Sequence, residues 1–299
     1  MFAAFPVAAL RAYEALARTL NAKEAGSELG VTPSAIYHQV RQVEEWLGVP
    51  LFLRKHRGME LSDAGQRFYG VLHSAFLDIA VCVSEISPAP QPSSVRISVP
   101  PAFAEFWLVP RLDTFQRRHP EVALRLETVV EPPDLNREAH IDVLICDIDR
   151  DAAGLVRHAE LTEDIGVYGS PSQVARASYV PSALLALPGQ ASAQDASGWY
   201  AWIAAARETW LEDGVAWREY PLQTLAIQAA IAGQGLILAS TALVSDSVAQ
   251  GRLMPYRPDV TLAGKGYTSL TLPGRERHPP ARMFLDWLSE AFTAPRQGR

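Results

Sequence analysis

The chain has 299 residues, 48% of them hydrophobic and 20% charged, which is the composition of an ordinary globular protein with room for two or three domains. A formal net charge of −6 excludes a protein that binds nucleic acid through a uniformly basic surface. The two cysteines, Cys82 and Cys146, lack the spacing of a zinc site or a disulfide framework, so we expect buried thiols, no bound metal and a cytoplasmic protein.

The N-terminal segment predicts a winged helix-turn-helix. Its first ten residues are apolar, but no Lys or Arg precedes the apolar stretch as it would in a signal peptide, so we do not expect one. Pro6 instead fits the first turn of an amphipathic helix. Residues 21–61 then indicate two short helices, a tight turn and a hairpin. Asn21 can cap the first short helix, and Thr32 can cap the second, which starts at Pro33.

The second short helix is predicted to be the recognition helix. Apolar residues recur along it at spacings of three and four and predict a buried stripe: Ile36, Val40, Val43 and Leu47. The opposite face carries groups that suit base edges and phosphates. We therefore predict DNA contacts by Thr32, Pro33, Ser34, Tyr37, His38 and Arg41.

The hairpin that follows has a basic tip, and we predict that it contacts phosphates as a wing through Arg54, Lys55 and Arg57. Residues 1–61 carry a net charge of +1 and the remainder −7, so the basic surface is local. DNA affinity is therefore expected to depend on dimerisation and on a small number of contacts between each copy and the DNA. The alternative is a helical module that never meets DNA, with a solvated hairpin tip.

Residues 63–86 predict one long helix with an apolar heptad seam formed by Phe68, Leu72, Ala75, Ile79, Cys82 and Ile86. A proline-rich linker follows, so the helix has little else to pack on and the seam favours a dimer. A helix that lies on its own domain is the alternative. A dimer would present two recognition helices to successive major grooves.

From Val95 onward, the pattern alternates between strands and helices, and this order predicts a parallel sheet. The strands are expected at residues 95–99, 122–126, 142–146, 165–168, 215–220 and 266–272. The helices are expected at residues 102–119 with a break at Pro110, and at 134–139, 199–207 and 281–291.

Residues 221–245 contain no charged residue and by length could cross a bilayer. Gly233, Gln234 and Gly235 interrupt the stretch, so we predict a buried helix to about Ala232, a strand at 236–239 and a new helix capped by Ser240 or Thr241. We expect no membrane association.

The run from Leu10 to Gly65, with SAIYHQVRQVE followed by LGVPLFLR, resembles the DNA-binding domain of the LysR-type transcriptional regulators. Three positions depart from that pattern. Ala22 replaces an aromatic residue and Gly26 an alanine, which implies a looser first helix. Tyr37 replaces a small hydroxyl residue, which implies an altered base preference.

The resemblance continues through Phe103–Pro120, Ala229–Gly235 and Tyr267–Pro273, and it is greatest to the branch of the glycine-cleavage activator and the β-lactamase regulator. It implies a small-molecule effector, a dimer or tetramer, and double-stranded DNA and RNA polymerase as partners. Some family members sense oxidants through cysteine, so a reactive thiol is the alternative to two buried ones.

The fold class that follows is an N-terminal all-α winged helix-turn-helix plus a long linker helix, and a C-terminal α/β two-lobed effector domain of the periplasmic-binding-protein type. The expected domains are the DNA-binding domain 1–61, the linker and dimerisation segment 62–94, lobe I at 95–163 with 266–299, and lobe II at 164–265.

Effectors of such lobes are expected beyond the carboxyl ends of strands and at helix N-termini, so the candidate effector residues are Pro101, Ala102, Phe103, Asp147, Thr224 and Tyr267. Relative to the family, Ala102 replaces a Ser or Thr that helps to hold a carboxylate, and Asp147 belongs to a pair that replaces Arg-Tyr. This implies a site less suited to carboxylates and better suited to a neutral or cationic ligand. The alternative is that Asp147 caps a surface loop.

No nucleophile elbow, phosphate loop or zinc-protease motif is present, so we predict no catalytic residue, no metal site and no cofactor. The favoured function is a ligand-responsive DNA-binding regulator. The alternatives are a solute-binding module without a DNA function and an α/β enzyme.

Overall fold

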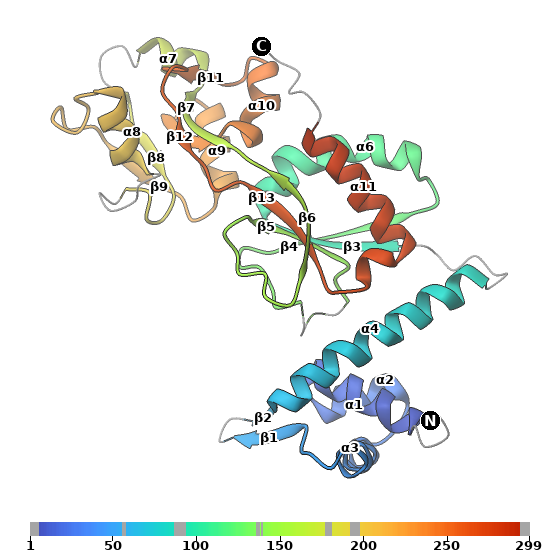
Figure 1. Cartoon of the computed structure of the whole chain (residues 1–299). Helices are drawn as coiled ribbons and strands as arrows, with labels where there is room; N and C mark the ends of the chain where they lie inside the picture. The colour runs from blue at the N-terminus through green and yellow to red at the C-terminus, as the bar shows by residue number, and fades with distance from the viewer. Residues whose placement is uncertain are drawn as a thin grey trace.

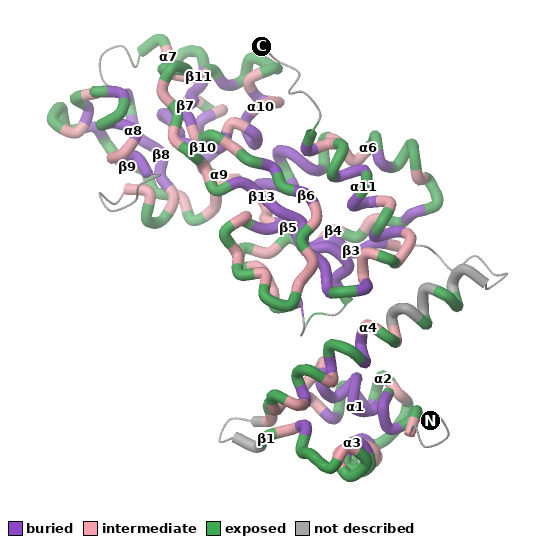
Figure 2. The backbone as a smooth tube through the Cα atoms, viewed as in Figure 1, coloured by how far each residue is buried: buried purple, intermediate pink, exposed green. Residues whose placement is uncertain are grey.

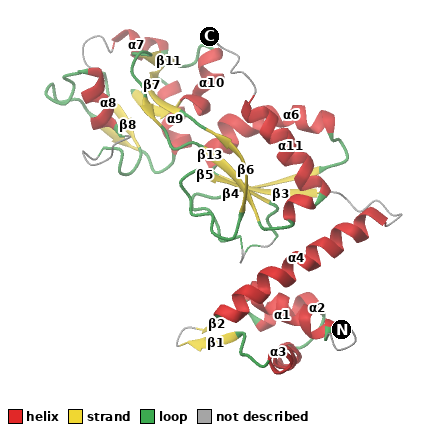
Figure 3. Ribbon diagram, in the orientation of Figure 1, coloured by secondary structure: helices red, strands yellow, loops and turns green. Residues whose placement is uncertain are grey.

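The computed structural model describes residues 6–55, 58–86, 94–135, 138, 140–176, 181–191 and 198–293. A helical N-terminal domain is followed by one long helix and then by two α/β lobes, each with its own sheet (Figure 1). Figure 3 shows the same division, with helices dominating the N-terminal part and strands confined to the wing and the two lobes.

The N-terminal domain consists of α1 (Val7–Thr19), α2 (Ala22–Leu29), α3 (Pro33–Leu47) and a hairpin of β1 (Phe52–Lys55) and β2 (Gly58–Leu61). The predicted caps are confirmed: the Asn21 side chain accepts a hydrogen bond from Lys23 N at 3.0 Å, and Thr32 Oγ1 accepts one from Ala35 N at 3.3 Å. These acceptors satisfy amide groups that a helix start leaves unpaired.

Helix α2 is complete, and Gly26 lies where the turn into α3 crosses it. A Cβ at Gly26 would lie 2.6 Å from the Val31 carbonyl oxygen, so the absence of a side chain lets the turn pack directly on the helix.

Helix α4 (Asp63–Ile86) leaves the N-terminal domain and passes below lobe I, where it contacts the short η3 helix (Arg275–Arg277) (Figure 1). Its first half is anchored to the domain, because Tyr69 and Leu72 are buried in the same apolar cluster as α1. The helix has the residue range that the sequence predicts.

The sheet of lobe I has the strand order β4-β3-β5-β13-β6. Its strands are β3 (Ser94–Val99), β4 (Ala123–Thr128), β5 (Val143–Asp147), β6 (Val156–Leu161) and β13 (Tyr267–Thr271). Strand β3 is parallel to β4 and β5, but β13 is antiparallel to both β5 and β6. The prediction of a parallel sheet is therefore wrong for β13 alone in this sheet, because β13 enters from lobe II and runs in the direction opposite to the other four strands.

One face of this sheet is covered by α6 (Val109–Arg118) and α11 (Pro279–Thr293), which lie side by side (Figure 1). The ring of Phe115 packs on Phe284 and Trp287 with centroids 5.6 Å apart in each case. The predicted break at Pro110 takes the form of a π-helical segment, η2 (Ala104–Leu108), between α5 (Pro101–Phe103) and α6. Pro110 has no N–H to donate, so it cannot form the i→i−4 bond of a continuous α-helix.

Lobe II has a second sheet in the order β11-β7-β10-β8-β9, with β12 also paired to β7. Its strands are β7 (Asp164–Gly169), β8 (Leu184–Ala186), β9 (Trp217–Glu219), β10 (Leu236–Ser240), β11 (Met254–Tyr256) and β12 (Leu262–Ala263). Its helices are α7 (Pro171–Arg176), α8 (Trp199–Ala206), α9 (Gln223–Ile231) and α10 (Thr241–Ala249). Strand β8 is parallel to β9 and β10, while β7 is antiparallel to β10 and β11.

The uncharged stretch at residues 221–245 folds as predicted, into α9, the fully buried strand β10 and the start of α10. The Ser240 side chain caps α10 by accepting hydrogen bonds from Ala242 N and Leu243 N. Within the described residues, no helix is long and apolar enough to cross a membrane.

The short helix predicted at residues 134–139 is not formed by the residues there that the structure describes. Glu138 N donates one hydrogen bond to Asp134 O at 3.0 Å, which makes a single turn. Pro132 and Pro133 immediately before this segment provide no amide donors for a preceding turn.

Candidate nucleic-acid interface and effector site

Helix α3 presents the predicted polar face to solvent. Ile36, Val40 and Val43 are buried against the domain, whereas every residue of the predicted contact set on this helix and its cap is exposed: Thr32, Pro33, Ser34, Tyr37, His38 and Arg41. The Tyr37 side chain remains 47% exposed although it is large and partly apolar. Thr32 Oγ1 lies 3.0 Å from Ser34 Oγ, so two hydroxyl groups meet at the helix start.

The wing is fixed to the recognition helix by Glu44, a residue that the sequence pattern did not single out. Its Oε1 accepts hydrogen bonds from Leu51 N at 2.7 Å and Phe52 N at 3.2 Å. The carboxylate therefore ties the end of α3 to the first residue of β1. This connection sets the position of the wing relative to α3.

The hairpin itself is formed as predicted, with Phe52 opposite Leu61 and Lys55 opposite Gly58. Arg54 and Lys55 belong to β1, but their side chains are outside the described part of the structure. Arg57 at the tip also lies outside the described residues. Their contacts with phosphate remain predictions.

The predicted seam on α4 divides into two parts. Phe68 packs on the core of the N-terminal domain and Leu72 is buried in it. Ala75, Ile79 and Cys82 are exposed, with Ile79 58% accessible, and the side chain of Ile86 is outside the described residues. The first part thus anchors α4 to its own domain, and the second is an apolar surface open to solvent (Figure 2).

A buried charged network joins α1 to α4. Glu14 Oε1 lies 2.9 Å from His73 Nδ1 and accepts a hydrogen bond from Arg18 Nε at 3.2 Å. Burial acts to raise the pKa of Glu14, but the hydrogen bonds and charges of His73 and Arg18 outweigh it and lower the pKa below its usual value. The Arg18 guanidinium also pairs with Glu28 at 2.6 Å, which extends the network to α2.

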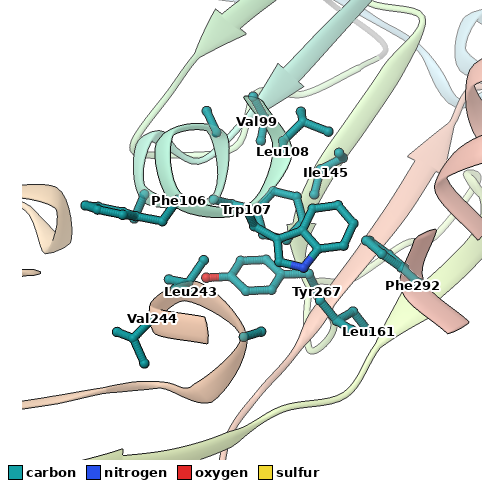
Figure 4. Close-up of a cluster of buried hydrophobic side chains, with 14 of the residues drawn as sticks. Val99, Phe106, Trp107, Leu108, Ile145, Leu161, Leu243, Val244, Tyr267 and Phe292 are labelled. Carbon is teal, nitrogen blue, oxygen red and sulfur yellow. The ribbon is translucent and has the colours of Figure 1, made fainter. Parts of the chain in front are cut away.

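The two lobes meet along an apolar seam. Phe106 and Trp107 of η2 face Leu243 and Val244 of α10, and Tyr267 lies between these two groups (Figure 4). Helix α5 also packs against α9. The residues of this contact are buried, so the lobes pack directly on one another along it.

Two polar contacts border the seam. Arg111 of α6 donates from Nη1 and Nη2 to the two carboxylate oxygens of Asp246 in α10, both at 2.9 Å. The same guanidinium lies 4.9 Å from the centre of the Trp107 ring. Gln228 Nε2 donates to Glu105 Oε1 at 3.1 Å, again from lobe II to lobe I.

The structure brings five of the six candidate effector residues close to the seam on the lobe I side. Ala102 and Phe103 are buried, Pro101 is half-buried, and the Phe103 and Tyr267 ring centroids are 4.5 Å apart. Tyr267 is directly opposite Asp147 in the β13–β5 register. The sixth residue, Thr224, is half-buried in the first turn of α9.

The connection from lobe I to lobe II brings a further acid to this site. Glu163 lies between β6 and β7, and Ser240 Oγ donates a hydrogen bond to its carboxylate. Burial raises the pKa of Tyr267, and the charges of Glu163 and Asp147 raise it further, so this phenol keeps its proton. Asp147 is exposed at the end of β5, and partial desolvation raises the pKa of its carboxyl, with Lys265 opposing the shift and Asp149 adding to it.

The two cysteines differ in their exposure to solvent. Cys146 is buried, and burial raises the pKa of its thiol to about 11, so it is inert as predicted. Cys82 is exposed on α4 in the single chain, so the expectation of two buried thiols is wrong for this one. Among the described residues, no cluster of three or more His, Cys, Asp or Glu side chains has the geometry to hold a metal ion.

Comparison with known proteins matches both parts of the chain. The model of the bacterial regulatory helix-turn-helix protein, lysR family, matches residues 7–66, and that of the LysR substrate binding domain matches residues 89–293. The HTH-type transcriptional regulator DsdC of Escherichia coli (strain K12) is 30% identical over 291 residues, covering 94% of this chain and 92% of that protein.

Two further comparisons agree. The glycine cleavage system transcriptional activator homolog of Haemophilus influenzae is 28% identical over 257 residues, covering 85% of this chain and 83% of that protein. The crystal structure of ArgP from Mycobacterium tuberculosis matches with a TM-score of 0.64 at 17% identity, covering 97% of this chain and 98% of that chain. The fold class predicted from the sequence, with its helix-turn-helix and two-lobed effector domain, is confirmed.

Proposed function

Since this chain belongs to the LysR family of bacterial transcriptional regulators, we propose that it binds double-stranded DNA with the exposed face of α3 and the wing, as paired copies, and that a small molecule between the lobes controls this binding. The exposed polar face of α3 carries the proposal. Ser34, His38 and Arg41 face solvent above the buried stripe of the same helix. They offer hydroxyl, imidazole and guanidinium groups to a major groove.

The roles that we propose for these side chains follow from their positions on α3 and the wing. Ser34 and His38 lie in the first half of α3, so they read base edges, while Arg41 and the basic tip hold phosphates. Glu44 fixes the wing relative to α3, so both contacts are made from one rigid unit. This arrangement needs no cofactor and no catalytic group, and it operates in the cytoplasm.

The surface of α4 formed by Ala75, Ile79 and Cys82 supports dimerisation. These side chains are exposed on one face, beyond the part of the helix that packs on its own domain. Pairing two copies along this face would bury an apolar stripe and double the few DNA contacts of each head. A dimer or a pair of dimers is the proposed form on DNA, with RNA polymerase as a further partner.

Control by an effector follows from the seam between the lobes. A ligand that favours one arrangement of the lobes shifts the population towards it. Because α4 contacts lobe I at η3, such a shift changes the spacing of the paired heads and the bend of the DNA.

The test is a gel-retardation titration of the full chain against duplex DNA at increasing salt. We expect sequence-selective retardation, with an affinity that falls about 10³-fold or more between roughly 50 and 200 mM salt if about six to ten phosphates are contacted. Absent or salt-insensitive binding would instead favour a solute-binding module without a DNA function.

A further inference from the structure

The segment between β13 and α11 carries the contact of lobe I with the long helix. In this segment, η3 (Arg275–Arg277) is closed by backbone hydrogen bonds from Arg275 N to Leu272 O at 3.0 Å and from His278 N to Arg275 O at 3.1 Å. Strand β13 is buried along its whole length, and α11 packs into the core of the same lobe. Because both neighbours belong to lobe I, η3 moves with that lobe.

A buried ion pair fixes this segment to the sheet of lobe I. Arg275 Nε lies 2.8 Å from Asp142 Oδ1, without the alignment of a hydrogen bond, and the two side chains are 16% and 8% exposed. The other carboxylate oxygen, Asp142 Oδ2, accepts a hydrogen bond from Arg96 N at 2.8 Å. One carboxylate thus connects η3 to the edge of the sheet where β3 and β5 begin. A buried pair is costly to break, because the remaining charge loses its compensation.

Two neighbouring side chains do not add to this attachment. Glu276 Oε2 and His278 Nδ1 are buried and have no hydrogen-bond partner within the part of the chain that the structure describes. Buried groups without a partner cost stability instead of contributing to it. The position of η3 therefore depends on the pair of Arg275 and Asp142.

On its other side, η3 contacts α4, which passes below lobe I (Figure 1). Burial raises the pKa of the Tyr69 phenol in α4, and the charges that act on it include Asp134 and Arg275 of lobe I, which shift it in opposite directions. The Tyr69 ring stacks on His73 one turn later, and His73 Nδ1 lies 2.9 Å from Glu14 Oε1 of α1. Lobe I therefore meets α4 where that helix is anchored to the N-terminal domain.

Beside this contact, the N-terminal domain and lobe I do not pack closely. A cavity of about 200 Å³ lies between them, with a lining that includes Asp134 of lobe I, Gln66 and Tyr69 of α4, and Glu60 and Leu61 of β2. Rigid contacts in proteins are close-packed, so this part of the boundary gives little resistance to rotation of the domain. The contact of η3 with α4 provides the resistance.

We propose that Arg275 is a positioning residue for DNA binding. Held by Asp142, it keeps η3 against α4 and so fixes the direction of the N-terminal domain relative to lobe I of the same chain. In a pair of copies, this direction sets the spacing of the two half-sites that both recognition helices reach. The inference rests on the proposed function and deepens it, because it names the residues through which lobe I acts on the DNA-binding domains.

The test is a gel-retardation titration of the full-length chain on three duplexes. One carries two half-sites at the spacing that the unmodified chain selects from a random pool. The second has this spacing lengthened by about five base pairs, half a helical turn, and the third carries a single half-site. The unmodified chain should prefer the selected spacing to the lengthened one by about tenfold or more, because only the first lets both domains bind at once.

Two variants remove the ion pair. Arg275→Met keeps the length of the side chain, and Asp142→Asn keeps an oxygen that accepts from Arg96 N. Each should reduce the spacing preference to less than about threefold and leave the affinity for the single half-site within about twofold. The double variant should equal either single one, since the two side chains act as one pair. Arg282→Met is the matched control, because Arg282 and Asp286 are exposed and 3.9 Å apart.

Thermal unfolding establishes first that each variant is folded, and if one is not, the other decides. An unchanged spacing preference in a folded variant would overturn the proposal, and so would an equal loss of affinity for the single half-site or equal binding of both spacings by the unmodified chain. Failure of both variants to fold would assign the pair to the stability of lobe I and overturn it too. These results leave the proposed function intact, whereas an unmodified chain without sequence-selective binding refutes that function.

Discussion

Arg111 and Asp246 join the two lobes by a pair of hydrogen bonds, Nη1 to Oδ2 and Nη2 to Oδ1, both 2.9 Å long. The two residues are 135 positions apart in the chain and about one third exposed, with side-chain accessibilities of 30% and 33%. Bidentate pairs of this kind are stronger than single surface ion pairs and fix orientation as well as distance. This contact therefore holds one edge of the packing between the lobes.

We expect Asp246→Asn to destabilise the packing between the lobes by roughly 1 kcal/mol, because the pair loses its charge and one of its two acceptors. Hydrogen exchange of the α10 and η2 amides measures the change, and exchange should become faster in both segments. The control is Arg117→Gln, which removes an ion pair whose partners are 70% and 74% exposed. If both variants show the same exchange rates as the unmodified chain, Arg111 and Asp246 do not hold the lobes.

Replacement of Glu14 by Gln should destabilise the N-terminal domain by about 1–2 kcal/mol, because His73 and Arg18 lose a charged acceptor in a buried setting. Thermal unfolding followed by circular dichroism measures the loss. Glu28→Gln alters the exposed end of the same network and should cost less than about 0.5 kcal/mol. Equal effects of the two variants would mean that the buried contact between Glu14 and His73 contributes no more to the stability of the domain than the exposed pair of Arg18 and Glu28.

Ile79→Glu should convert the proposed dimer to a monomer at micromolar concentration, because it places a charge in the apolar face of α4. Analytical ultracentrifugation gives the mass directly. Gly70→Glu is the matched control, since Gly70 lies on the opposite side of α4 and a Cβ there meets nothing within 4 Å. A dimer that survives Ile79→Glu but not Gly70→Glu would place the interface elsewhere.

Lobe I should lose stability as the pH falls below about 6.5. Burial lowers the pKa of His158, against the opposing charge of Glu276, and burial likewise lowers the pKa of His278. Both rings bind protons more readily in the unfolded chain, so their contribution is present above the ordinary histidine pKa and is lost as the pH drops toward the folded values. His158 Nε2 lies 2.9 Å from Thr271 Oγ1.

Thermal unfolding of the full chain at about pH 7.5 and about pH 5.5 measures this dependence. The unmodified chain should unfold at a lower temperature at the lower pH, and His158→Gln should reduce the difference. Two results would contradict the role given to His158: a melting temperature that rises on acidification, or a difference in melting temperature between the two pH values that is the same in His158→Gln as in the unmodified chain.

Local patterns were sufficient to predict the elements of the N-terminal domain and the helix α4. The caps at Asn21 and Thr32 and the apolar stripe of α3 depend on residues within one or two turns, and α4 follows from its own heptad spacing. The strand at 236–240 was found because glycines interrupt an uncharged run. In each case the signal and the structure lie in the same short segment.

Contacts between distant segments could not be predicted in this way. The direction of β13 depends on its return from lobe II, which no local pattern records. Glu14 and His73 are 59 residues apart, and neither stands out within its own helix. Asp246 carried the clearest missed signal, because it is the first charge after twenty-five uncharged residues and pairs across the lobes.

In the proposed function, the exposed face of α3 reads DNA sequence. Selection of bound duplexes from a random pool, performed with the full chain and with the His38→Ala and Arg41→Ala variants, measures this sequence preference. We expect the unmodified chain to enrich a two-fold symmetric site. His38→Ala should relax or alter the preference at particular bases, and Arg41→Ala should bind the same site uniformly more weakly. Enrichment of the same site with the same stringency by the unmodified chain and both variants would contradict it.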